Sequence, residues 1–282
     1  MSKLRYTVEY DHRFGLYRWQ IAPGQRLLPT PVAAARRFPR LVALGDGAGL
    51  AILLQSLKAA LFAPGSAWSP GAGGERLTAI VSVGTDRDGA GCLAPRECLV
   101  ALFEGDATTA AIFDFPLNGT GEGQSQRLVL EPDGVSRALA AIEAADLIVL
   151  GPARLHASLI AVLRAKVIAE AIGRSKARVV LVMNLMTELG QTDGYTAIDH
   201  LLAIRSHASA VRIHDVLFNT APFASDLLAR YAAHGQAPVE INVEHLRAHG
   251  CRPIGRDLLG QGPMGRHDPA KLARAVLELV RT

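Results

Sequence analysis

The chain has 282 residues, of which 49% are hydrophobic, and its formal net charge is +4. This size suffices for one large core or two modest ones, and no run of about 18 apolar residues is present that would span a membrane. The arginines are dispersed and do not form a basic stripe with aromatic residues, so no nucleic-acid partner is expected. The opening segment is polar and aromatic, and it favours a cytoplasmic location. Three cysteines without CxxC spacing predict neither a disulfide framework nor a zinc ribbon.

Residues 1–38 do not have the pattern of a core. They contain one short alternating stretch at 6–10, which is followed by aromatic and proline-rich sequence. We therefore divide the chain into an N-terminal extension, residues 1–38, and one domain, residues 39–282. The extension is predicted to pack on that domain, on a protein partner or on a second copy of the chain in a homodimer.

A glycine-rich turn joins the first core strand to an apolar helix. The strand at 41–44 ends in Gly45-Asp46-Gly47-Ala48-Gly49, and the helical pattern runs over 50–61. Glycine lets backbone N–H groups approach a ligand closely, and a helix N-terminus carries partial positive charge. The stretch therefore predicts a phosphate-binding turn, and a purely steric role for the glycines is the alternative.

Strands and helices alternate along the rest of the chain. Residues 77–83 are predicted to be a buried strand that ends in acids and glycines, and residues 98–103 are predicted to be helical. Further on, we expect strands at 110–115, 127–130, 146–150, 178–183 and 215–218, and helices at 134–145, 158–172, 197–207, 225–234 and 269–280. This alternation predicts an α/β fold in which a mostly parallel sheet is covered by helices on both faces.

The loops that follow parallel strands gather at one edge of the sheet, where ligands bind. The loop at 184–195 is unusually polar. Its Asn184, Thr187 and Thr192 carry groups suited to a base, a ribose or a phosphate, or to capping the next helix. The acids after the second strand lie about 40 positions beyond the glycine turn, whereas a dinucleotide fold places its ribose-binding acid about 20 positions on, so NAD is not expected.

Histidines supply two further candidates. His245 and His249 share a helical spacing close to Cys251, which suits either a metal site or a structural role, although the glutamate of an HExxH motif is absent. His156 follows the strand at 146–150, where it either touches a phosphate or lies at the surface.

Several of these segments resemble the CofD-like superfamily, which comprises 2-phospho-L-lactate transferase and the YvcK-type gluconeogenesis factors. Residues 42–57 resemble the strand, GGGTG loop and helix of the YvcK branch, and residues 77–93 resemble its ITAIVTVADDGGSSGRL segment. Residues 96–102 resemble RNCLVAL, and residues 145–159 resemble ADLIVLGPGSLYTSI. Residues 184–200 resemble NLMTQPGETDGYTASDH nearly position by position.

The resemblance implies a three-layer, Rossmann-like α/β domain at 39–282 that binds a phosphorylated nucleotide. It implies that the stretch 45–49 borders the phosphates and that Asn184, Thr187 and Thr192 line the nucleotide side. Asp86 and Arg96 match positions that would face the acceptor or a metal if the protein were an enzyme. The transferase branch uses a divalent metal, so Mg²⁺ is expected at Asp86 and Asp88. No flavin or NAD is expected as a bound cofactor.

Five substitutions depart from the family pattern. Thr85 replaces the first acid of the DDGG loop, and Arg87 and Asp88 replace its glycines. Asp46 replaces a glycine of the GGGTG loop, which places a carboxylate where an anionic ligand would lie. We expect an outward orientation or a bridging cation to remove that conflict. Arg154 replaces the serine of GPGSL.

We therefore predict that the protein binds a nucleotide diphosphate or a nucleotide sugar, of the UDP-sugar or GDP type. Its role would be regulatory, in carbon or cell-envelope metabolism. Two alternatives stay open. One is a transferase that cleaves a nucleotide diphosphate donor and transfers a phosphoryl-linked group, and the other is a scaffold subunit with a vestigial pocket that contacts a partner through residues 1–38.

Overall fold

A computed structural model describes residues 6–11, 16–21, 39–62, 77–82, 98–103 and 133–280. The chain divides into two compact units, Met1–Arg36 and Arg37–Thr282. In the first unit, β1 (Tyr6–Asp11) and β2 (Leu16–Ile21) form an antiparallel hairpin. The short strand expected at 6–10 is therefore present, and the aromatic stretch after it supplies the partner strand.

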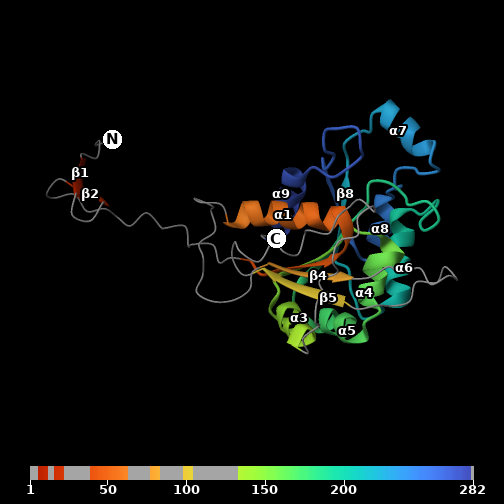
Figure 1. The fold of residues 1–282 in the computed structure, drawn as a ribbon, viewed down its shortest axis with the longest axis horizontal. Coiled ribbons are helices and arrows are strands. Elements are labelled where there is room, and N and C mark those ends of the chain that lie inside the picture. The colour runs from red at the N-terminus through yellow and green to blue at the C-terminus, as the bar shows by residue number, and fades with distance from the viewer. Residues whose placement is uncertain are drawn as a thin grey trace, which may run out of the picture. The chain divides into compact units, whose positions relative to one another are not determined.

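The second unit is built around a seven-stranded sheet (Figure 1). Its strands in chain order are β3 (Leu41–Gly45), β4 (Leu77–Ser82), β5 (Cys98–Phe103), β6 (Leu147–Leu150), β7 (Arg178–Val182), β8 (Asp215–Asn219) and β9 (Arg252–Arg256). Their order across the sheet is β5-β4-β3-β6-β7-β8-β9, and every neighbouring pair is parallel except β4 with β5. The expected mostly parallel sheet is confirmed.

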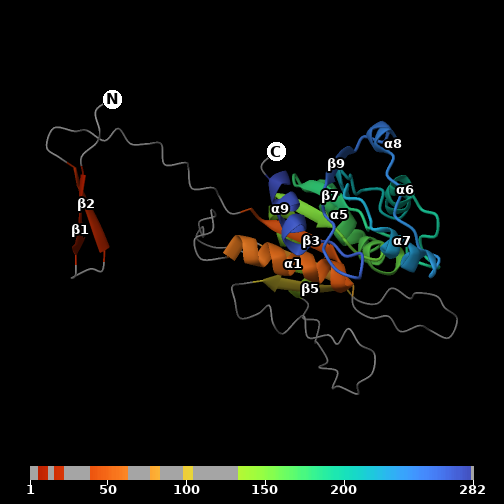
Figure 2. The same ribbon diagram turned by 90° about the horizontal axis from the view of Figure 1, so that it is seen from above.

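Helices cover both faces of this sheet and give the expected three layers. They are α1 (Gly47–Phe62), α3 (Asp133–Ala144), η1 (Leu155–Ile160), α4 (Ala161–Leu163), α5 (Lys166–Arg174), α6 (Ala197–His207), α7 (Ser225–Ala232), α8 (Val243–Ala248) and α9 (Pro269–Leu279). Figure 2 shows α1 and α9 side by side on one face, and Figure 1 shows α3 and α5 on the other. Along β3, Leu41 and Ala43 pack with α1 and α9, whereas Val42 and Leu44 pack with the opposite layer.

The order of the strands changes direction at β3. The chain leaves β3 through α1 to β4 on one side, whereas β6 lies on the other side of β3. The connections that follow β3 and β6 therefore lead away from each other. In open α/β sheets this divergence leaves a crevice at the carboxyl ends of the strands, and ligands bind there.

Residues 98–103 are a strand, so the prediction of a helix was wrong. As β5, they pair antiparallel with β4 from Phe103 opposite Leu77 to Cys98 opposite Ser82. A run of six apolar residues is too short for its periodicity to separate helix from strand. The tertiary context decides, because the run closes the edge of the sheet beside β4.

The helix expected at 158–172 is interrupted. Its first turn, η1, is a wide turn in which the N–H of Leu159 donates to the carbonyl of Arg154 at 3.0 Å, five residues earlier. The helical conformation is then interrupted at Ala165, whose ψ of 97° is extended, and α5 begins at the next residue. The helix α8 and the strand β9 were not predicted. The strands expected at 110–115 and 127–130 lie outside the described residues. None of the helices described is long and apolar enough to cross a membrane.

Candidate functional site

A cavity of about 500 Å³ lies at the carboxyl-terminal edge of the sheet. It is lined by residues that follow three neighbouring strands: Asp46 and Gly49 after β3, residues 152–154 after β6, and residues 184–188 after β7. Tyr231 of α7, Gln236 and the segment 265–267 line its remaining sides. The cavity therefore lies where the strand order diverges, between the ends of β3 and β6.

The glycines of the first turn allow two loops to approach each other. Gly45 has a φ of 153°, and a Cβ there would lie 2.8 Å from the Cβ of Ala153. A Cβ at Gly49 would lie 2.8 Å from the carbonyl oxygen of Pro152. Both glycines thus have the steric role that was the alternative to phosphate binding, and Gly49 also lines the cavity. Gly47 and Ala48 belong to the first turn of α1.

Asp46 and Arg154 form an ion pair between the same two loops. Arg154 Nη2 donates to Asp46 Oδ2 at 2.6 Å. The Asp46 side chain is 10% exposed, whereas that of Arg154 is 45% exposed. The chain's own guanidinium therefore neutralises the carboxylate that was expected to oppose an anionic ligand. Neither the outward orientation nor the bridging cation that we expected is needed.

Glu188 lies near this pair. Burial raises the pKa of its carboxyl, Arg154 opposes the shift, and Asp46 adds to it. Asn184 Nδ2 lies 3.5 Å from Glu188 Oε1 and donates to the carbonyl of Ala153 at 2.9 Å. Asn184 thus joins the loop after β7 to the loop after β6 and lines the cavity, and its contact with a nucleotide stays a prediction.

The two threonines of the β7 loop bond to the backbone. Thr187 lines the cavity, and its hydroxyl accepts from the N–H of Ala237 at 3.0 Å. Thr192 is 1% exposed and does not line the cavity, and its hydroxyl accepts from the N–H of Glu188 at 2.8 Å. The hydroxyl of Thr192 therefore shapes the loop that presents Glu188.

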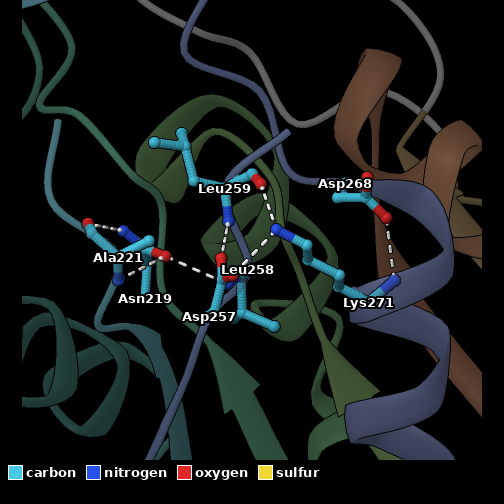
Figure 3. Close-up of polar contacts among 7 residues, drawn as sticks. All are labelled: Asn219, Ala221, Asp257, Leu258, Leu259, Asp268 and Lys271. Atoms are coloured by element: carbon cyan, nitrogen blue, oxygen red, sulfur yellow. Dashed lines mark hydrogen bonds and ion pairs between the residues drawn. The ribbon is translucent and has the colours of Figure 1, made fainter. Parts of the chain in front are cut away.

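The wall formed by the segment between β9 and α9 is fixed at its first end by two polar side chains (Figure 3). Asn219 Oδ1, at the end of β8, accepts from the N–H of Leu258 at 3.0 Å. Lys271 Nζ donates to Asp257 Oδ2 at 2.9 Å and to the carbonyl of Leu259 at 3.0 Å. These bonds fix the direction in which the segment after β9 leaves the edge of the sheet.

The second end of this wall leads into α9. Asp268 caps that helix by accepting from the N–H of Lys271 at 2.9 Å (Figure 3). The two residues before the cap, Arg266 and His267, line the cavity. Arg266 is exposed, whereas His267 is 9% exposed. Burial lowers the pKa of the His267 imidazole to about 4, so the ring is neutral at pH 7.

Five further residues line the cavity and were not predicted from the sequence: Glu188, Tyr231, Gln236, Arg266 and His267. Glu188 was within the β7 loop that was expected at the site. The other four lie in segments without a recognisable motif. The start of α9, marked by an aspartate cap and a proline, was the available signal, because a helix that follows a parallel strand begins near the edge where ligands bind.

The remaining candidates lie elsewhere. Asp86, Asp88 and Arg96 are outside the described residues, so their roles stay predictions. His156 does not line the cavity and makes an edge-to-face contact with Tyr195. Within the ranges that the structure describes, no group of three His, Cys, Asp or Glu residues could hold a metal ion. His249 is the C-cap residue of α8, and the buried Cys251 thiol donates to the carbonyl of Ile213 at 3.4 Å.

The family model described as 2-phospho-L-lactate transferase CofD matches residues 118–259, half of the chain. The chain belongs to the CofD family. It is 40% identical over 141 residues to the gluconeogenesis factor of Halalkalibacterium halodurans, a match that covers 50% of this chain and 44% of that protein. It is 32% identical over 188 residues to the putative gluconeogenesis factor of Thermotoga maritima, covering 65% and 59%.

A solved structure of a upf0052 family member from Bacillus halodurans has 38% sequence identity and a TM-score of 0.48 to this CofD-family chain, covering 49% of this chain and 45% of that one. The chain spans about half the length of these relatives. The match to the CofD model and the similarity to gluconeogenesis factors confirm the resemblance to the CofD-like superfamily and its YvcK branch. The family match includes the loops after β6 and β7 but not Asp46, which lies before it.

Proposed function

We propose that the cavity binds a nucleotide diphosphate or a nucleotide sugar, of the UDP-sugar or GDP type, and that the protein is a regulator of carbon or cell-envelope metabolism. The observation that carries this proposal is the place of the cavity, at the divergence between β3 and β6 and beside the first turns of α1. Backbone N–H groups at a helix N-terminus suit phosphate. The name gluconeogenesis factor, which the relatives carry, supports the regulatory part.

Arginine in the cavity supports an anionic ligand. Arg154 uses one nitrogen for Asp46, and its side chain is 45% exposed, so its remaining N–H groups are available to phosphate oxygens. Arg266 adds a second exposed guanidinium on another wall. Tyr231 supplies an aromatic ring of the kind on which bases stack.

A second candidate is a transferase that cleaves a nucleotide diphosphate donor. The family description favours it, and so does Glu188, because a carboxyl with a raised pKa in a cavity is a candidate general acid or base. Mg²⁺ would be held by one or two carboxylates together with the phosphates. Asp86 and Asp88 stay the proposed ligands, because Asp46, one of the two carboxylates that line the cavity, is paired with Arg154.

Calorimetric titration with UDP-glucose, GDP and GTP tests the proposal. We expect saturable binding of one of them with about one site per chain, and no heat or thermal stabilisation with any of the three would contradict it. Release of UMP or GMP in the presence of Mg²⁺, abolished in Asp86→Asn, would instead establish the transferase. Contact of residues 1–38 with a partner or a second copy, and a cytoplasmic location, stay separate predictions.

A further inference from the structure

One buried nitrogen atom beside the cavity has no hydrogen-bond partner. In the part of the chain that the structure describes, four buried side-chain atoms lack a partner: Ser158 Oγ, Gln191 Oε1, His200 Nε2 and His267 Nε2. Of these four residues, His267 alone lines the cavity. Buried polar groups are nearly always bonded, so an unpartnered one at the wall of a cavity indicates that a ligand supplies the partner.

The other ring nitrogen of His267, Nδ1, determines whether the ligand must donate or accept a hydrogen bond at Nε2. The backbone of Met183 raises the pKa of the ring, which is the effect of a carbonyl acceptor and not of an N–H donor. The N–H of Met183 already donates to the carbonyl of Leu217, which leaves the Met183 carbonyl as the acceptor. In the neutral ring, Nδ1 therefore carries the proton and Nε2 carries a lone pair.

We infer that His267 Nε2 accepts a hydrogen bond from an O–H or N–H group in the uncharged part of the nucleotide ligand, which is its base, ribose or sugar. This inference rests on the proposed function. A phosphate oxygen is excluded as the partner, because it and Nε2 are both acceptors at neutral pH. The phosphates are better matched at Arg154 and the first turn of α1, which form other walls of the same cavity.

His267 would therefore make the site selective for ligands with a donor group at this wall. A phosphate-only ligand such as pyrophosphate would leave the nitrogen unpartnered. A nucleotide or a nucleotide sugar would satisfy it, because nucleosides and sugars carry several O–H and N–H groups. The residue is a specificity determinant, and its backbone contact to Met183 is a separate, structural role.

Two substitutions separate these roles. In His267→Asn, the side-chain amide reaches the position of Nδ1, so the Met183 contact is kept and the group at Nε2 is lost. In His267→Gln, the amide reaches the position of Nε2, so an acceptor is kept there and the Met183 contact is lost. We expect His267→Asn to weaken UDP-glucose binding by about 3- to 10-fold with little change in melting temperature. We expect His267→Gln to retain affinity within about twofold and to melt at a lower temperature.

Titrations with UDP-glucose, UDP and pyrophosphate show which part of the ligand carries the donor group. GDP replaces UDP in this series if GDP binds more tightly. Weakening of both nucleotides in His267→Asn places the donor on the nucleoside, and weakening of UDP-glucose alone places it on the sugar. Unchanged affinity in His267→Asn, an equal loss for pyrophosphate, or a parallel loss in both variants would overturn the inference. Failure of the unaltered protein to bind any nucleotide is a distinct result, which overturns the proposed function and with it this inference.

Discussion

Arg154 donates a hydrogen bond to Asp46 at 2.6 Å across 108 positions of sequence, and so joins the loop after β6 to the loop after β3. The two loops flank the point where the strand order diverges. Both residues replace small ones in the resembling family segments, glycine at 46 and serine at 154. The two substitutions are complementary, because the buried carboxylate of one is neutralised by the guanidinium of the other.

The two substitutions are predicted to be energetically coupled. Arg154→Ser leaves the Asp46 carboxylate, 10% exposed, without its partner, and should lower the free energy of unfolding by about 1–2 kcal/mol. The double variant Asp46→Gly with Arg154→Ser should recover about 1 kcal/mol of that loss. Urea denaturation of the two single variants and the double variant measures the coupling. Additive effects within about 0.3 kcal/mol would show that the pair contributes nothing.

Acid is predicted to destabilise the fold through His267. Its pKa is about 4 in the folded chain and near 6.5 when unfolded, so between these values the unfolded chain binds more protons. The stability that the neutral ring contributes is present above pH 6.5 and is lost as the pH falls towards 4. We expect a loss of about 2 kcal/mol from this group between pH 7 and pH 4.5. Denaturant unfolding gives the free energy of unfolding of the unaltered protein and of His267→Gln at pH 7 and at pH 4.5. The same loss of free energy in both proteins would refute the prediction.

Asp215 is predicted to be essential to the β7–β8–β9 half of the sheet. Its side chain is fully buried and accepts from Arg178 at 2.8 and 2.9 Å and from Arg252 at 2.8 Å. Burial alone would raise the pKa of this carboxyl, but the bonds from the two arginines lower it overall. Asp215→Ala should cost about 2–4 kcal/mol, because both arginines lose their carboxylate at the strand ends. A loss below about 0.5 kcal/mol on urea denaturation would count against this role.

Lys271 is predicted to affect ligand affinity without lining the cavity. It fixes the start of the wall that carries Arg266 and His267, through Asp257 and the carbonyl of Leu259. Lys271→Met should weaken nucleotide binding several-fold, because that wall loses its anchor. Lys166→Met is the matched control, since Lys166 is 86% exposed on α5. Equal affinities in the two variants would show that the anchor does not position the wall.

The sequence was sufficient for the parts of the fold and site that depend on local pattern. Buried strands such as 178–182 follow from apolar runs of adequate length, and α6 was predicted with its observed bounds from the helical pattern at 197–207. The glycine turn after β3 and the polar loop after β7 were expected at the site because each follows a strand. The six-residue run at 98–103 was not assignable, since only its pairing with β4 makes it a strand.

The sequence was not sufficient for contacts between distant segments. Asp46 was expected to need an outward orientation or a cation, because nothing in the chain order indicates that Arg154 reaches it. Arg266 and His267 were not singled out, because their place at the cavity depends on bonds that fix the segment before α9. Thr192 was expected beside the ligand, but its hydroxyl bonds to the backbone of its own loop.

The most direct test of nucleotide binding at the divergence of β3 and β6 is one set of calorimetric titrations. UDP-glucose and GDP are titrated in turn into the unaltered protein, Arg154→Met and Lys166→Met. The account predicts saturable binding of at least one nucleotide, weakened about 10-fold or more in Arg154→Met and unchanged in Lys166→Met. No binding by the unaltered protein, or equal affinity in all three proteins, would contradict it.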